Sequence, residues 1–240
     1  MNRIFCFWTG TNEMSENRKR GIASLRAQSG CEVVLITADR VGDLVPAADL
    51  HPAYRHLNLA HRSDYLRCYA MRHQGGGYAD IKPNHHDWTP YFDRLAASPD
   101  LWAIGYREHT PGSVSNMYTS SKDLGLSAPR RAGAYLHRKW LQANHKRLIG
   151  CCSFICKPGT PFVEEWWQEM NRRLDRLLPA LERHPARVPH ERPGDIVDGA
   201  PSRYPVPWTH ILGDIFHPLG LKYTRRMSRD LPPPVSGNYR

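Results

Sequence analysis

Short apolar runs alternate with amphipathic stretches along the first part of the chain. Residues 3–9 form an apolar run, and Cys31–Thr37 forms a second run rich in β-branched residues. Between them, Ser15 is a suitable N-cap for a helix that extends to about Gln28. The order strand, helix, strand predicts a βαβ unit at the start of an α/β domain.

A third strand is predicted directly after a helix stop. Apolar spacings of three and four residues predict a helix that begins at Asn58 or Ser63. Gly75 ends this helix, because glycine adopts the left-handed C′ conformation without steric cost. Tyr78–Ile81 follows as a short strand. Asp80 therefore lies at the carboxyl end of a strand, where open α/β sheets bind ligands.

The second half of the chain gives a less complete pattern. Leu101–Tyr106 and Leu148–Cys156 are predicted strands, whereas the polar stretch 107–147 between them shows no pattern that we can assign. Thr160, followed by proline, predicts the N-cap of a helix whose apolar stripe continues to Leu181.

Two proline-rich segments follow that helix. Residues 185–207 are too long for an ordinary connection and are typical of a lid or binding loop. The chain is apolar again over Trp208–Phe216. Residues 230–240 are predicted to form an extended tail. No internal repeat or linker is visible, so we expect residues 1–240 to form a single domain.

Composition excludes several classes of protein. Hydrophobic residues make up 40% of the 240 residues and charged residues 23%, which is typical of a globular protein. No apolar run is long enough to cross a bilayer. The six cysteines form no Cys-x-x-Cys pair, and so we expect buried thiols, no zinc site at Cys152 and Cys156, and a cytoplasmic location.

The net charge of +10 indicates that the surface attracts anions. Charge alone does not identify the anion. A non-catalytic basic module that binds nucleic acid or an acidic glycan therefore remains an alternative function, although nucleic acid is the less favoured partner because no long block of like charge is present.

Asp64, Arg67 and Asp80 have a spacing that is typical of a binding site for a sugar or a phosphate. Asp64 and Arg67 are three residues apart on the predicted helix and share a face, where an ion pair alone would contribute about 0.2–0.5 kcal/mol. The run Gly75–Gly77 then leads into the strand that ends at Asp80. A carboxylate accepts hydrogen bonds from sugar hydroxyls, and a guanidinium donates to phosphate oxygens in a fixed geometry.

Ser63-Asp64-x-x-Arg67 followed by Gly75-Gly76-Gly77-Tyr78-Ala79-Asp80 resembles the DXD-containing glycosyltransferases of family 32 type. It is similar also to capsular polysaccharide synthesis proteins and to glycosyltransferases of large algal viruses. The resemblance is specific over residues 58–88 and looser over 149–162 and 204–218. It implies a GT-A fold, which is a Rossmann-like α/β domain with a mixed, mainly parallel central sheet flanked by helices.

The resemblance also implies roles for individual residues. Trp8, Thr9 and Gly10 would lie beside the nucleobase of a nucleotide-sugar donor. Asp64 and Arg67 would hold the donor sugar, and Asp80 would touch the ribose or a metal ion.

Lys82 departs from the family pattern. The second carboxylate of Asp-x-Asp binds Mn²⁺ or Mg²⁺ in such enzymes, but this chain reads Asp80-Ile81-Lys82. One carboxylate binds a hard dication poorly. Our hypothesis is that the Lys82 ammonium supplies part of the missing positive charge beside the diphosphate, which puts Lys82 among the catalytic residues.

Further candidates lie in the second half of the chain. By the resemblance, Ser153 contacts the sugar and His217 binds phosphate or a metal. Asp214 is a candidate base for an acceptor hydroxyl, with Glu108 and Asp198 as rivals. Each also has an ordinary structural explanation, since Asp214 can cap a turn and a lone histidine in an apolar run is more often only hydrogen-bonded.

The sequence thus predicts a hexosyl- or pentosyltransferase. Its donor would be a UDP-sugar such as UDP-xylose or UDP-glucose, and its acceptor a hydroxyl of a glycan or glycoconjugate. A donor hydrolase or a degenerate transferase is a further alternative that would bind the donor without forming an acceptor product.

Overall fold

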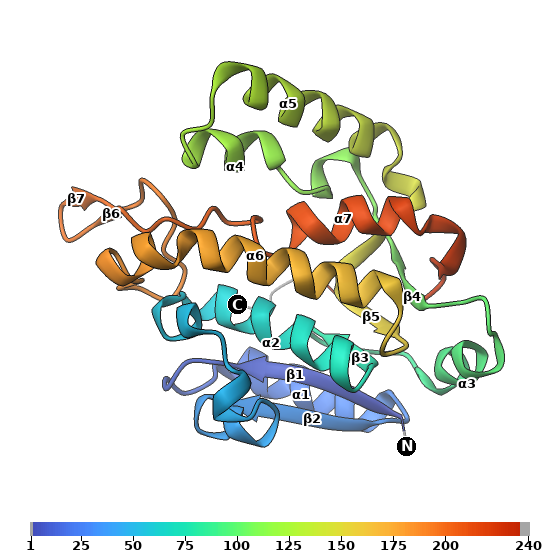
Figure 1. The fold of residues 1–240 in the computed structure, drawn as a ribbon. Helices are drawn as coiled ribbons and strands as arrows, with labels where there is room; N and C mark the ends of the chain where they lie inside the picture. Colours follow the sequence, from blue (N-terminus) through green and yellow to red (C-terminus); the bar gives the residue numbers. More distant parts are fainter. Residues whose placement is uncertain (1, 236–240) are drawn as a thin grey trace.

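A six-stranded sheet runs through the centre of the molecule in the computed structural model, which describes residues 2–235 (Figure 1). A separate two-stranded sheet, at the left of Figure 1, lies near the C-terminal end of the longest helix. The strands are β1 (Arg3–Trp8), β2 (Glu32–Thr37), β3 (Gly76–Ala79), β4 (Ala103–Arg107), β5 (Ile149–Cys156), β6 (Ile196–Val197), β7 (Ala200–Pro201) and β8 (Met227–Ser228). The α-helices are α1 (Glu16–Gln28), α2 (Leu59–His73), α3 (Thr89–Ala97), α4 (Met117–Asp123), α5 (Ala128–Ala143), α6 (Pro161–Arg183) and α7 (Gly213–Lys222).

Most strands of the central sheet point the same way. The order is β2-β1-β3-β5-β4-β8, in which β1 is parallel to β2 and to β3, and β4 is parallel to β8. Strand β5 is antiparallel to both of its neighbours, β3 and β4. The predicted mixed, mainly parallel sheet flanked by helices is therefore confirmed. The carboxyl ends of β1, β3 and β4 share one edge, which we call the carboxyl edge.

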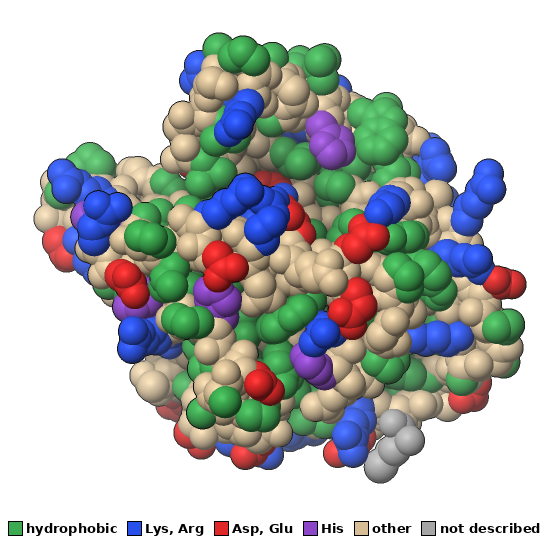
Figure 2. Space-filling model, viewed as in Figure 1, with side chains coloured by type: hydrophobic (Ala, Val, Ile, Leu, Met, Phe, Trp, Pro, Cys, Tyr) green, Lys and Arg blue, Asp and Glu red, His purple; other side chains and the backbone are tan. Residues whose placement is uncertain are grey.

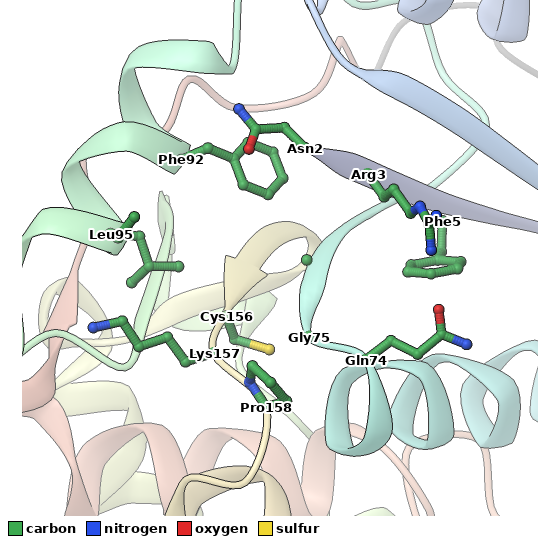
Figure 3. Close-up of a pocket in the computed structure, with 12 residues that line it drawn as sticks. Asn2, Arg3, Phe5, Gln74, Gly75, Phe92, Leu95, Cys156, Lys157 and Pro158 are labelled. Atoms are coloured by element: carbon green, nitrogen blue, oxygen red, sulfur yellow. The ribbon is translucent and has the colours of Figure 1, made fainter.

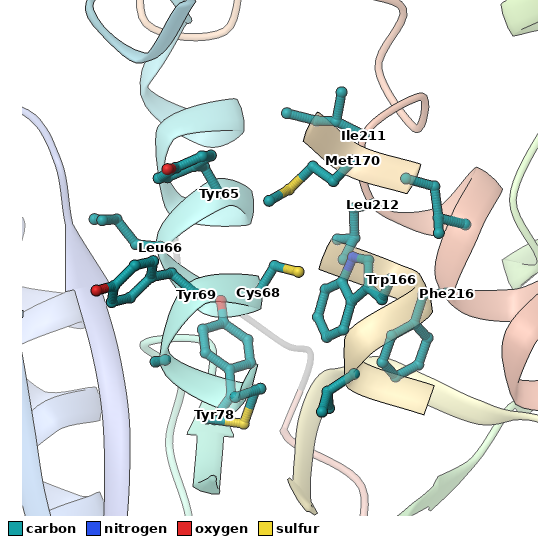
Figure 4. Close-up of a cluster of buried hydrophobic side chains, with 14 of the residues drawn as sticks. Tyr65, Leu66, Cys68, Tyr69, Tyr78, Trp166, Met170, Ile211, Leu212 and Phe216 are labelled. Atoms are coloured by element: carbon teal, nitrogen blue, oxygen red, sulfur yellow. The ribbon is translucent and has the colours of Figure 1, made fainter. Parts of the chain in front are cut away.

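The two faces of the sheet bury different side chains. In β1, Ile4 and Cys6 contact the layer formed by α1 and α3, whereas Phe5 and Phe7 face α2, because successive strand residues point to opposite faces. The larger cluster fills the space between the sheet and helices α2, α6 and α7 (Figure 4). Trp166 of α6 and Phe216 of α7 meet there edge to face, with ring centroids 5.1 Å apart. This packing fixes α2, and with it the predicted site residues, against the sheet.

Local sequence rules place the elements around the site. The Ser15 side chain accepts a hydrogen bond from the Arg18 amide, so α1 has the predicted bounds. Asn58 caps α2 in the same way, accepting from the His61 amide at 2.7 Å. Gly75 has φ +64°, and a Cβ at this position would lie 2.5 Å from Pro158 Cδ, so both conformation and space require glycine.

Two predicted details differ from the structure. Strand β3 is Gly76–Ala79 rather than Tyr78–Ile81. It begins earlier because Gly76 pairs with Cys156 of β5 and Gly77 pairs with Ile155. Asp80 consequently follows the last strand residue. Thr160 is the N-cap of α6, but its buried hydroxyl has no hydrogen-bond partner among the described residues.

The stretch 107–147, which the sequence pattern left unassigned, contains helices α4 and α5. They form a lobe that stands away from the sheet, at the top of Figure 1. The proline-rich loop 185–207 carries the β6–β7 hairpin and is tied to the start of α2, where the Leu59 amide donates to Pro189 O at 3.1 Å. The last five residues of the predicted tail 230–240 lie outside the described part of the chain.

Candidate active site

Four charged side chains meet at the carboxyl edge of the sheet, and we call them the charged cluster: Asp64, Arg67, Asp80 and Lys82. Arg67 Nη2 lies 3.3 Å from Asp64 Oδ1 and 3.7 Å from Asp80 Oδ1. Lys82 Nζ lies 3.0 Å from Asp80 Oδ2. Asp80 is the most open of the four, with 24% of its side chain exposed, and is therefore the member that a ligand reaches first.

Arg67 is held in one orientation by neighbours that the sequence analysis missed. Its Nη1 donates to the carbonyl of Cys151 at 2.6 Å and its Nη2 to the Tyr78 hydroxyl at 2.7 Å. The Tyr78 hydroxyl donates in turn to Asp80 Oδ1 at 2.7 Å. Tyr78 and Asp80 are two residues apart on extended backbone and share a face, so strand periodicity alone would have identified Tyr78.

The two carboxyl groups of the cluster titrate differently. Burial favours the protonated form of Asp80, but the adjacent Lys82 and Arg67 outweigh burial and hold the pKa of Asp80 below its ordinary value. Burial raises the pKa of Asp64 to about 7, because the lost hydration outweighs the attraction of Arg67. At neutral pH, Asp80 is therefore ionised, whereas Asp64, with a pKa of about 7, is protonated in about half of the molecules.

The raised pKa of Asp64 is expected to make the free energy of unfolding depend on pH. In the unfolded chain an aspartate has a pKa of about 3.9, so between about pH 4 and pH 7 the folded state binds the additional proton. The contribution of Asp64 to the free energy of unfolding therefore falls as pH rises through this window, by on the order of 2–4 kcal/mol. Urea titrations of the wild type and Asp64→Asn between pH 4 and 8 measure this contribution as their difference. A difference that stays constant, or that rises with pH, contradicts the prediction.

Trp8, Thr9 and Gly10 lie where β1 ends, next to the first turn of α2. The Thr9 hydroxyl donates to the carbonyl of Leu59 at 2.7 Å, and Trp8 Nε1 donates to the carbonyl of Asn12 at 2.7 Å. The end of β1 is thereby joined to the helix that carries Asp64 and Arg67. Trp8, Thr9 and Gly10, the predicted nucleobase contacts, therefore lie at the same edge of the sheet as the charged cluster.

The side chains at this edge do not fit a divalent cation. Asp80 is the single carboxylate of the Asp80-Ile81-Lys82 triplet, and its two oxygens already contact Tyr78 and Lys82. Within residues 2–235, no group of three histidine, cysteine or acidic side chains is arranged to hold a metal ion. All six cysteines, each within this range, are free thiols.

A second polar pair lies at the carboxyl edge, beyond the start of β5. Glu108 follows β4, and its amide donates to Leu148 O at 3.3 Å. His217 Nε2 lies 3.3 Å from Glu108 Oε1, and its Nδ1 accepts from the amide of Ser115 at 3.0 Å. Since Nδ1 accepts, the proton of a neutral imidazole is on Nε2 and faces Glu108. Despite burial, the imidazole holds the pKa of Glu108 below its ordinary value.

Asp214 occupies a different position, at the start of α7. Its Oδ1 accepts a hydrogen bond from the Thr209 hydroxyl at 2.7 Å. Trp208 precedes Thr209, and its carbonyl oxygen lies 3.2 Å from Nε2 of His61. His61 is on α2, three residues before Asp64. The segment 208–214 thus leads from the first turn of α2 to Asp214.

Asp214 also lines a cavity of about 470 Å³. The cavity lies between the α4–α5 lobe and helices α6 and α7, where Figure 2 shows the surface hollowed below the lobe. His137 of α5 and the charged residues Glu169, Arg172 and Arg173 of α6 contribute to its wall. The arrangement presents carboxylates and guanidinium groups to a ligand of moderate size.

Two other predicted residues do not join the charged cluster. Ser153 is buried in β5, and strand alternation places it on the face of Ile155, which packs towards α1 and α3. Asp198 lies in the exposed turn between β6 and β7, with φ +52°, and its carboxylate contacts Arg187 at 3.4 Å. Within residues 2–235, the buried Ser153 hydroxyl has no hydrogen-bond partner.

Another cavity of about 470 Å³ opens at the opposite edge of the sheet (Figure 3). It is lined by the first residues of β1 and β3, by α3, and by Cys156 and Lys157 at the end of β5. The charged cluster lies at the other ends of these strands. This second cavity is therefore separate from the predicted site.

Comparison with solved structures shows a similarity of fold. No family model matches the chain, and the curated proteins contain no match either. The fold is similar to that of mouse xyloside xylosyltransferase 1 in its apo form, with a TM-score of 0.45, 10% sequence identity, and coverage of 94% of this chain and 83% of that chain. No helix within residues 2–235 is both long and apolar enough to cross a membrane. At this TM-score the similarity does not decide the function.

Proposed function

We propose that this protein is a glycosyltransferase that transfers a sugar from a nucleotide donor, such as UDP-glucose or UDP-xylose, to a hydroxyl of a glycan or glycoconjugate. The observation that carries the proposal is the convergence of Asp64, Arg67, Asp80 and Lys82 at the carboxyl edge of a mainly parallel sheet. Ligands of open α/β sheets bind at this edge. The motif resemblance over residues 58–88 assigns donor-binding roles to three of these four residues.

The roles follow from charge and exposure. Arg67 is buried and fixed by Tyr78 and Cys151, so it orients the two carboxylates and presents a rigid positive field. Asp80 is partly exposed and ionised, and it accepts hydrogen bonds from ribose or sugar hydroxyls. Lys82 stabilises the negative charge that develops on the departing diphosphate, since preorganised cations at such positions lower the barrier.

The acceptor is proposed to enter the cavity below the α4–α5 lobe. Asp214 lines this cavity, and the segment 208–214 connects it to the helix that carries Asp64. Asp214 is the proposed base for the acceptor hydroxyl. Glu108 is the rival, because it lies at the carboxyl edge and is ionised beside His217.

Binding of UDP and UDP-sugars, measured by calorimetry, tests the proposal. Asp80→Asn is expected to weaken donor binding about 10- to 100-fold, since hydrogen bonds to charged groups contribute about 1.5–3 kcal/mol. Asp43→Asn is a matched control, because Asp43 is an exposed aspartate that contacts Arg40 away from the cluster.

The alternative of a basic module gives the opposite result. Removing the negative charge of Asp80 would leave binding of a polyanion unchanged or make it tighter. Donor binding that is equal in wild type and Asp80→Asn, or tighter in the variant, therefore contradicts the proposal. Donor binding without any acceptor product would indicate a hydrolase or a degenerate transferase.

A further inference from the structure

Helix α5 turns its apolar side towards solvent. Leu136 and Trp140 are 67% and 51% exposed, although both are large and hydrophobic. They are four residues apart and lie on one face of the helix. The same face continues through four further exposed apolar or small residues, Pro129, Ala132, Gly133 and Ala143. We call these six residues the outer stripe.

The opposite side of α5 makes few packing contacts with the rest of the molecule. Leu141 is the one fully buried residue of the helix, and α5 packs mainly against α4. Packing against the core therefore does not account for the apolar residues of α5. Figure 2 shows hydrophobic side chains gathered at the top of the lobe that α5 forms in Figure 1.

The charge of α5 identifies the kind of surface that fits the outer stripe. The helix carries Arg130, Arg131, Arg138 and Lys139 and no acidic residue. Lys139 is three residues from Leu136, and Arg130 is three residues from Gly133, so cations flank the stripe. A basic amphipathic helix with exposed tryptophan and leucine is typical of helices that lie in the interface of an anionic membrane.

A second copy of the chain fits this face poorly. Two outer stripes in contact would bring together two helices that each carry four cations and no acid, within chains that each carry a net charge of +10. Like charges across an interface cost free energy. An anionic lipid surface instead gains from the same charges.

We infer that α5 docks the protein onto the surface of an anionic lipid bilayer, with Leu136 and Trp140 inserted among the headgroups. Lys139 and Arg130, which flank the outer stripe, then face the lipid phosphates. The inference is independent of the reaction at the charged cluster, because none of these residues contributes to it.

Sedimentation with lipid vesicles tests the inference. The full chain is expected to sediment with vesicles of equal parts phosphatidylglycerol and phosphatidylcholine, but not with phosphatidylcholine alone. Salt at about 0.5 M is expected to release most of it, because screening removes the electrostatic attraction. Equal binding to both kinds of vesicle overturns the anionic preference.

Two sets of variants separate the apolar and the charged contributions. Leu136→Gln with Trp140→Gln keeps the net charge and is expected to lower vesicle binding about tenfold or more. Ile196→Gln is the matched control, since Ile196 is 71% exposed on the β6–β7 hairpin. Replacing the flanking Arg130 and Lys139 with glutamine is expected to weaken the preference for phosphatidylglycerol.

The result that overturns the inference is equal vesicle binding by the Leu136/Trp140 double variant and by Ile196→Gln. A wild type that binds no vesicles, but whose dimeric mass in light scattering is lost in the double variant, also overturns it and assigns the outer stripe to a second copy. All these positions are exposed, so urea titration is expected to show that each variant folds like the wild type.

Discussion

Replacing Arg67 with methionine is expected to lower the free energy of unfolding by about 3–5 kcal/mol, the cost of removing one partner from a buried ion pair. The substitution removes the cation that lies 3.3 Å from Asp64, and it leaves the Cys151 carbonyl and the Tyr78 hydroxyl without their donor. Urea denaturation measures the loss. Because Asp64 can take up a proton when its cation is absent, the loss is expected to be larger at pH 8 than at pH 6.

Arg72→Met provides the matched control on the same helix. Arg72 pairs with Glu164 at 2.9 Å, but both side chains are about one-third exposed (29% and 34%), so the change is expected to cost less than about 1 kcal/mol. Adding Asp64→Asn to Arg67→Met is expected to recover part of the stability, since the buried carboxylate is then absent. Equal effects of Arg67→Met and Arg72→Met would show that the cluster is not a buried network.

The parts of the fold that sequence predicted well depend on local rules. Ser15 caps α1 and Gly75 ends α2 because capping and left-handed backbone geometry depend on a few neighbouring residues. The spacing of Asp64 and Arg67 on one helix, followed by Asp80 at a strand end, similarly follows from the two regular periods. These residues meet in the structure as the sequence predicts.

The parts that sequence did not predict depend on tertiary contacts. Glu108 and His217 are far apart in the chain and are brought together because α7 packs on β5, the neighbour of β4. The sequence pattern does not identify helix α5, because its apolar stripe, with Leu136 and Trp140, faces solvent and lies within a strongly basic segment. The sequence does not show which face of the sheet the Ser153 side chain occupies, because this depends on the register of β5.

Lys82 is proposed to stabilise the negative charge that develops on the leaving diphosphate. Its ammonium lies 3.0 Å from Asp80 Oδ2, at the position that carries the second carboxylate in an Asp-x-Asp motif. If the lysine supplies the positive charge for the leaving diphosphate, turnover of the wild type is expected to persist in excess chelator. Lys82→Ala is then expected to lower kcat about 10²- to 10³-fold, the usual effect of removing one group that stabilises transition-state charge.

Lys82→Asp gives the sharpest form of this prediction, because it restores the Asp-x-Asp pattern. Two carboxylates bind a hard dication better than one, so the variant is expected to be inactive in chelator and to regain activity with Mn²⁺, whereas Lys82→Ala is not. Lys19→Ala controls for the loss of a lysine, since Lys19 is exposed and pairs with Glu13 and Glu16 on the surface. Wild-type turnover that disappears in chelator and returns with Mn²⁺ would show that a metal ion, and not Lys82, neutralises the diphosphate. Chelator-resistant turnover that is equal in wild type and Lys82→Ala would remove Lys82 from the mechanism altogether.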